Sequence, residues 1–248
     1  MKESVEVRVF GDAAELARGA AEEIAFRIEE TLCERDRFSW ALSGGSTPRA
    51  LYRLLASDSY RERLPWSGVH FFWGDERHVP PDHPESNFRM AREAMLDAVP
   101  VPAENVHRIA AEEPDAERAA RLYEEELRSF FALSRGEWPR FDLVLLGLGA
   151  DGHTASLFPG SAALHERERL VVAPWVETQR AFRITLTPPV LSGARRALFL
   201  VSGAEKAAAL RAVLAGDREP DRYPAQAVEG NRLWLVDRAA AGLLRSRG

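Results

Sequence analysis

The segment Gly147-Leu148-Gly149-Ala150-Asp151-Gly152-His153-Thr154 comes directly after the apolar run 141–146. The run is typical of a short buried strand, and the glycines behind it let the backbone turn sharply and approach a ligand closely. The turn then places an acid and an imidazole two residues apart. Open α/β folds keep their sites at the carboxyl ends of sheet strands. We therefore expect Asp151 and His153 to face a site there.

Strand-like and helix-like segments alternate along the rest of the chain, and no repeat or linker divides it. This alternation predicts an α/β fold: a single domain over residues 1–248, with an open, mostly parallel sheet covered by helices on both faces, Rossmann-like in its layering. The strands are expected at 1–10, 38–42, 69–73, 141–146, 170–173, 182–186, 197–201 and 233–236. The helices are expected after Asp12 and at 48–56, 88–98, 115–133, 204–214 and 238–244.

The composition narrows the class of protein. The 248 residues are 46% hydrophobic and 29% charged, with a formal net charge of -5, which is typical of a globular protein with a sizeable core. The mild acidity argues against nucleic acid as a partner. No apolar run reaches membrane-spanning length, and residues 1–10 lack a signal-peptide core, so a cytoplasmic protein is expected. The one cysteine, Cys33, excludes an internal disulfide and is expected to be a small buried hydrophobe.

The stretch Ser43-Gly44-Gly45-Ser46-Thr47-Pro48 lies between an expected strand and an expected helix. Its glycines let backbone N–H groups converge, and a helix N-terminus adds partial positive charge, so the turn suits a phosphate. The alternative is a plain tight turn with a capping serine or threonine. The stretch is not a P-loop, because the Gly-Lys-Ser/Thr ending is missing, and glycines do not flank Ser46 as in a nucleophile elbow.

The glycine segment at 147–152 also matches G-x-G-x-x-G, the weak fingerprint of a dinucleotide site. That fingerprint requires a helix to begin at the turn, whereas Pro159-Gly160 interrupts the segment almost at once. The imidazole of His153 suits proton transfer better, because its unperturbed pKa of about 6.5 lies near neutral pH.

A long polar loop is expected at 74–87, stiffened by prolines and rich in charge. Its Asp75 and Arg77 are candidates for lining a site, whereas Glu76 and His78, taken alone, are typical of a solvated charge run. His78 and His83 lack a partner at ligand spacing, so no metal site is predicted.

Two cations lie at unusual places farther along. Arg183 falls within an expected strand, where a charge is costly unless paired. Lys206 follows Ser202-Gly203 at an expected helix start. Together the two cations would complete a phosphate site; each alone is typical of the surface.

Taken together, these segments resemble the 6-phosphogluconolactonase family, in the wider fold group of glucosamine-6-phosphate deaminases and ribose-5-phosphate isomerases. The similarity runs in order through nearly the whole chain. It is carried by residues 43–48, 75–80, Ser86-Asn87, 147–159, 183–187, 202–206, and the tail from Pro224-Ala225 through Trp234 and Asp237.

The resemblance implies hydrolysis of 6-phospho-D-glucono-1,5-lactone to 6-phospho-D-gluconate in the oxidative pentose phosphate pathway. It implies that His153 is the general base, that Arg77 lines the site, and that Arg183 and Lys206 approach the phosphate. Asp151 is assigned to orienting His153 or the sugar hydroxyls. The remaining substrate-binding candidates are Ser43, Gly44, Gly45, Ser46, Thr47, Asp75 and Asn87. The expected partner is a sugar-phosphate lactone bound by a monomer, with no metal, nucleotide or other cofactor.

Two alternatives stay open. The deaminase branch has a glutamate before the proline that follows the Gly-His segment, to drive ring opening and isomerisation. Here that position is Phe158, which cannot move protons, so the substitution favours the lactonase. The other alternative is a non-catalytic sugar-phosphate-binding domain, although binding alone needs neither Asp151 nor His153.

Overall fold

The main sheet confirms the predicted α/β fold. The structure, a computed structural model, describes residues 4–244, and within them six strands form one sheet in which every neighbouring pair is parallel. Three strands in the middle (β9, β5 and β2) are buried along their whole length, as expected for a parallel sheet covered on both faces. The order across the sheet is β1 (Ser4–Phe10), β10 (Asn231–Asp237), β9 (Ala197–Val201), β5 (Leu143–Leu146), β2 (Phe38–Leu42) and β3 (Val69–Trp73).

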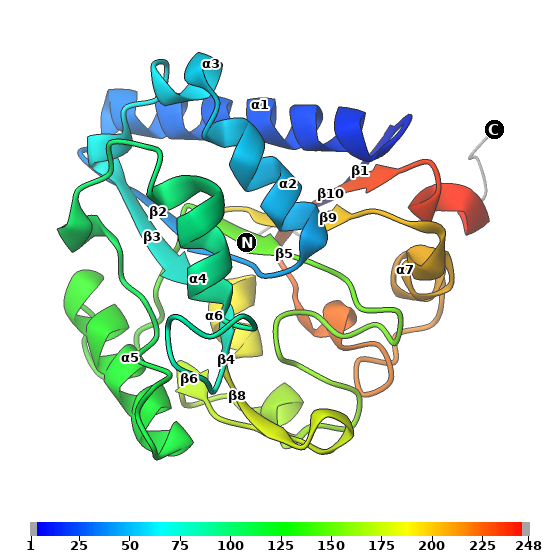
Figure 1. Cartoon of the computed structure of the whole chain (residues 1–248). Coiled ribbons are helices and arrows are strands. Elements are labelled where there is room, and N and C mark those ends of the chain that lie inside the picture. Colours follow the sequence, from blue (N-terminus) through cyan, green and yellow to red (C-terminus); the bar gives the residue numbers. More distant parts are fainter. Residues whose placement is uncertain (1–3, 245–248) are drawn as a thin grey trace.

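Helices cover both faces of this sheet (Figure 1). Helices α1 (Ala13–Glu34) and α2 (Ser46–Leu55) lie on one face. The other side holds α5 (Ala116–Phe130), α6 (Pro188–Ser192) and α7 (Ala207–Ala215). The shorter pieces are α3 (Asp58–Arg61), α4 (Asn87–Ala91) with a π-helical continuation over Arg92–Leu96, and 3-10 turns at Trp66–Gly68, Ala103–Asn105, Ala162–His165, Glu177–Gln179, Ala204–Lys206, Pro224–Ala227 and Ala240–Leu243.

A second, antiparallel sheet was not predicted. Its central strand, β8 (Ala181–Leu186), pairs with β4 (Asp75–Arg77), β6 (Val171–Val172) and β7 (Trp175–Val176). The expected loop at 74–87 therefore begins with a strand. Three charged residues carry no alternation of apolar and polar positions, so the sequence pattern cannot show β4.

Several other expectations need correction. The helix expected at 48–56 begins two residues earlier, and the one expected at 238–244 is only a 3-10 turn. Residues 1–3 of the first expected strand lie outside the described residues. Cys33 is exposed on α1, not buried. Among residues 4–244, no helix is both long and apolar enough to span a membrane.

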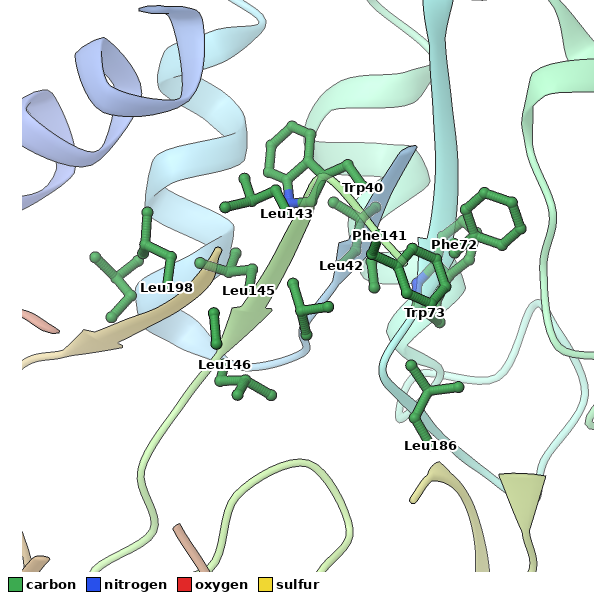
Figure 2. Packing of buried hydrophobic residues seen from close by; sticks show 14 of the residues in the cluster. Trp40, Leu42, Phe72, Trp73, Phe141, Leu143, Leu145, Leu146, Leu186 and Leu198 are labelled. Carbon is green, nitrogen blue, oxygen red and sulfur yellow. The ribbon is translucent and has the colours of Figure 1, made fainter. Parts of the chain in front are cut away.

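The sheet order brings the predicted site segments together. Large side chains from neighbouring strands fill one core and fix the strand ends; Figure 2 shows Trp40, Leu145 and Leu198 from three adjacent strands, and Leu186 of β8 in the same cluster. The chain moves from β2 to β3 in one direction and from β5 to β9 in the other, so the topology switches between β5 and β2. Open α/β folds bind ligands outside the strand ends at such a switch point.

Candidate active site

His153 and Asp151 form a hydrogen-bonded pair beyond the carboxyl end of β5. Nδ1 of His153 lies 2.6 Å from Oδ1 of Asp151, which also accepts the His153 backbone N–H over 3.1 Å. Partial burial alone would raise the pKa of Asp151, but this N–H and the adjacent imidazole outweigh burial and hold the pKa below its usual value. An ionised carboxylate at Nδ1 assigns the proton of neutral His153 to that nitrogen and leaves the lone pair on Nε2. The imidazole is 32% exposed, so water reaches this base.

Gly149 of the turn leaves the space that this pair occupies. A Cβ at Gly149 would lie 2.0 Å from Nδ1 of His153 and 2.5 Å from Oδ1 of Asp151, closer than non-bonded atoms approach. Phe158 stacks on the imidazole, with ring centroids 4.5 Å apart and planes at 29°. No helix begins between residues 147 and 161, so the dinucleotide fingerprint lacks the helix that it requires.

The turn after β2 is held by a buried tyrosine. The hydroxyl of Tyr52 accepts the backbone N–H of Ser43 over 3.0 Å and donates to the Ser43 carbonyl over 2.8 Å. Gly45, with a φ of 111°, is the N-cap of α2, and no side chain makes a capping hydrogen bond. This rules out a serine or threonine cap. The first N–H groups of α2, those of Ser46 and Thr47, have no intrahelical acceptor and are available to an anion.

Asn87 and Asp75 join this turn to the neighbouring segments. A Cβ at Gly44 would lie 1.9 Å from Oδ1 of Asn87, so the amide sits directly against the glycine. Asn87 donates from Nδ2 to the Asp75 carbonyl over 3.0 Å. The Asp75 carboxylate accepts the Ser156 hydroxyl over 2.7 Å. The turn after β2, strand β4 and the segment after β5 are thus joined by buried side-chain contacts.

Arg77 and Arg183 face each other across the β4–β8 pair. Arg77 donates from Nη1 to the Glu85 carbonyl over 2.8 Å, and Arg183 donates to the side-chain oxygen of Gln179. Burial, and then repulsion from Arg77, lower the pKa of Arg183. Within the described residues neither guanidinium forms an ion pair with a carboxylate. Carboxylates of Asp75, Glu85 and Glu76 are near enough for their charges to act on Arg183. Two adjacent guanidinium groups that form no direct ion pair still suit an anionic ligand.

Lys206 is placed by the fold alone. It ends the 3-10 turn Ala204–Lys206 that follows β9, the strand beside β5. Among residues 4–244 no hydrogen bond or ion pair joins Lys206 to the other predicted site residues. Its part in a phosphate site stays a prediction.

Sequence reasoning missed three residues that shape the site. Glu76, expected to be solvated, is only 2% exposed. Ser156 and Tyr52 carry hydrogen bonds that no local pattern indicates, since each partner is distant or on the backbone.

His78 and His83 bind backbone groups of Glu113 and Glu85. Within the described part of the chain, no group of three or more potential ligands could hold a metal ion.

Comparisons with known proteins show the family of the chain. Residues 11–236 match the family described as glucosamine-6-phosphate isomerases/6-phosphogluconolactonase. A 6-phosphogluconolactonase of Synechocystis is 46% identical over 90% of this chain and 91% of its own, and one of Nostoc is 42% identical over 98% and 99%. The solved 6-phosphogluconolactonase of Trypanosoma brucei superposes with a TM-score of 0.87 at 33% identity, covering 98% of this chain and all of its own. The resemblance expected from the sequence is confirmed: the chain belongs to the glucosamine-6-phosphate isomerase/6-phosphogluconolactonase family.

Proposed function

We propose that this chain hydrolyses 6-phospho-D-glucono-1,5-lactone to 6-phospho-D-gluconate, as the names of its relatives suggest. The observation that carries the chemistry is the 2.6 Å contact between Nδ1 of His153 and Asp151, which leaves Nε2 free at a solvent-accessible turn. Lactone hydrolysis needs a base that can take a proton from water and return it, and this pair supplies one.

The reaction starts with water held by Nε2 of His153. The imidazole takes a proton as the water oxygen attacks C1 of the lactone, and the C1 oxygen becomes an oxyanion. When the tetrahedral intermediate collapses, the bond from C1 to the ring oxygen breaks, and the imidazolium protonates that oxygen. A positioned base contributes about 10²–10⁴-fold to such a step. Asp151 keeps the imidazole oriented and stabilises its charged form.

Arg77 and the backbone N–H groups of the glycine turn are the candidates for stabilising the oxyanion, and one such donor is worth about 3–4 kcal/mol. The phosphate binds at a distance from C1. The N–H groups at Ser46 and Thr47, together with Arg183 and Lys206, provide positive potential for it. This binding energy orients the ring against the base.

Phe158 separates this proposal from a deaminase. Its ring packs on the imidazole of His153 at 4.5 Å, where an acid would be needed to open a sugar ring. A phenyl group moves no proton, so the site has one base and not the additional carboxylate that isomerisation requires. A non-catalytic sugar-phosphate binder would need no such base.

We place the enzyme in the cytoplasm, because the charge of a phosphorylated sugar keeps that substrate there. We propose that the enzyme acts as a monomer. Sedimentation at micromolar concentration tests the second point, and a concentration-dependent dimer would contradict it.

A coupled assay for 6-phosphogluconate tests the activity directly. The lactone is generated in place, and the rate of spontaneous opening is subtracted. We expect a catalysed rate proportional to enzyme concentration, and no ammonia from glucosamine 6-phosphate. Ammonia release with no acceleration of lactone opening would favour the deaminase; binding of the lactone without turnover would favour the non-catalytic domain.

A further inference from the structure

Glu76 is a buried carboxylate between two predicted site residues. It is 2% exposed, and burial raises its pKa even though three backbone N–H groups act in the opposite direction. Burying an acid without partners is costly, so its contacts show what the position requires. The mechanism above assigns Glu76 no step.

Four donors surround this carboxylate. Oε1 accepts the backbone N–H groups of Arg77 and Asn87, both at 2.7 Å. Oε2 accepts the Phe88 N–H over 2.8 Å and the Ser86 hydroxyl over 3.0 Å. One side chain therefore ties the residue that begins the 77–86 segment to the residues that follow it.

Two of these donors belong to residues that form the site. Arg77 lies opposite Arg183 on the β4–β8 pair, and Asn87 sits against Gly44 of the turn after β2. Two further hydrogen bonds hold the 77–86 segment: Arg77 donates to the Glu85 carbonyl within it, and Arg89 of α4 donates to the Asp82 carbonyl, each over 2.8 Å. These hydrogen bonds hold the segment in one position, so it is not a free loop.

We infer that Glu76 is a positioning residue that sets Arg77 and the Asn87–Gly44 contact for lactone hydrolysis by closing the 77–86 segment onto the start of α4. Only a carboxylate fits this task. It offers two acceptor oxygens and no donor, whereas an amide turns one end into a donor facing N–H groups. The inference rests on the proposed function, because it assigns Glu76 an effect through that site.

The test compares Glu76→Gln with Glu124→Gln. Glu124 is the matched control: it is also buried, at 8% exposure, and accepts from Arg128, Arg169 and the Leu170 N–H away from the site. Both substitutions should lower the Tm of the enzyme. We expect only Glu76→Gln to lower kcat/KM, by about 10²-fold, the penalty typical of a catalytic arrangement displaced by about 1 Å. Equal kcat/KM in the two folded variants would overturn the inference.

A double-mutant cycle with Arg77→Ala separates positioning from general damage. If Glu76 acts through Arg77, Glu76→Gln should cost a clearly smaller factor in the Arg77→Ala background than in the unmodified enzyme. The same factor in both backgrounds would refute the connection. Should Glu76→Gln not fold, Glu76→Asp replaces it: the charge stays but the shorter side chain cannot reach both ends of the segment, and an unchanged kcat/KM would refute the role.

The cycle also distinguishes this inference from the proposed function. Full activity in folded Arg77→Ala would mean that the site itself is misassigned. Activity lost in Arg77→Ala but kept in folded Glu76→Gln would leave the site standing and reject only the role of Glu76.

Discussion

Asp151 is proposed to act on the reaction through the imidazole that it holds. The two side chains are 2.6 Å apart, and the ionised carboxylate selects the tautomer with a free Nε2. Asp151→Asn removes the charge that stabilises the imidazolium, so kcat should fall. The fall should be smaller than the loss expected on removing the base itself, which is about 10²–10⁴-fold. Asp221→Asn is the matched control, since Asp221 pairs with His165 over 2.9 Å on the surface. Equal kcat in the two variants would argue against the assignment.

Arg183 is expected to bind the phosphate end of the substrate. It is partly buried beside Arg77, and burial lowers its pKa, which fits a cation that is completed by an anionic ligand. Arg183→Ala should raise KM for the phosphorylated lactone and leave KM for glucono-1,5-lactone nearly unchanged. Arg211→Ala, on the exposed side of α7, controls for loss of surface charge. The same loss on both lactones would show that Arg183 does not bind the phosphate.

At the scale of elements, the carboxyl ends of β2 and β3 are each held by hydrogen bonds to a tyrosine hydroxyl. Tyr52 binds both backbone groups of Ser43, and Tyr123 binds both backbone groups of Trp73. The two tyrosines lie on α2 and α5, so each helix fixes where one strand ends. Only the Ser43 turn leads into the N–H groups proposed to hold a phosphate.

Because the two tyrosines make the same contacts, the substitution of one is a control for the substitution of the other. Tyr52→Phe and Tyr123→Phe each leave a buried N–H without its acceptor, so each should lower the free energy of unfolding by about 1–3 kcal/mol. Urea unfolding measures that loss. Only Tyr52→Phe should also raise KM for the phosphorylated lactone. An equal KM in both variants would separate the Ser43 turn from phosphate binding.

At the scale of the whole molecule, a histidine pair links stability to pH. His70 lies 3.1 Å from His107, which binds Glu126 over 2.6 Å. Burial, and then His107 and Arg37, lower the pKa of His70 to about 4, against about 6.5 in an unfolded chain. Between these values the unfolded state binds the extra proton, so stability at neutral pH is lost as pH falls from about 6.5 toward 4.

The measurement is the urea midpoint at several pH values across this window. We expect His70→Gln to reduce the fall in stability, whereas His165→Gln, at an exposed ion pair, should leave it unchanged. An identical pH dependence in His70→Gln would show that His70 does not carry the effect.

The whole-chain fold and part of the site follow from sequence pattern. Buried runs and helix starts locate the parallel sheet, and the strand order then brings Ser43, Asp151 and Lys206 to neighbouring strand ends. Glu76 could not be found this way, because three of its four donors, the Ser86 hydroxyl and two backbone N–H groups, lie ten to twelve residues away, and the fourth is the backbone N–H of the next residue. Strand β4 has three residues and no periodicity, so the sequence pattern does not reveal it.

That residues 1–248 form one domain stays a proposal. Unfolding followed by fluorescence and by circular dichroism tests it: one shared transition would support a single domain, and two separate transitions would contradict it.

His153, as the proposed base, is the residue on which lactone hydrolysis depends most. The decisive measurement is kcat and KM of His153→Ala for 6-phospho-D-glucono-1,5-lactone, with spontaneous opening subtracted and folding checked by circular dichroism. We predict that kcat falls by about 10²–10⁴-fold while KM changes little, because the imidazole transfers protons during the reaction and does not hold the lactone in the site. A folded variant with near-unchanged kcat would contradict the central claim.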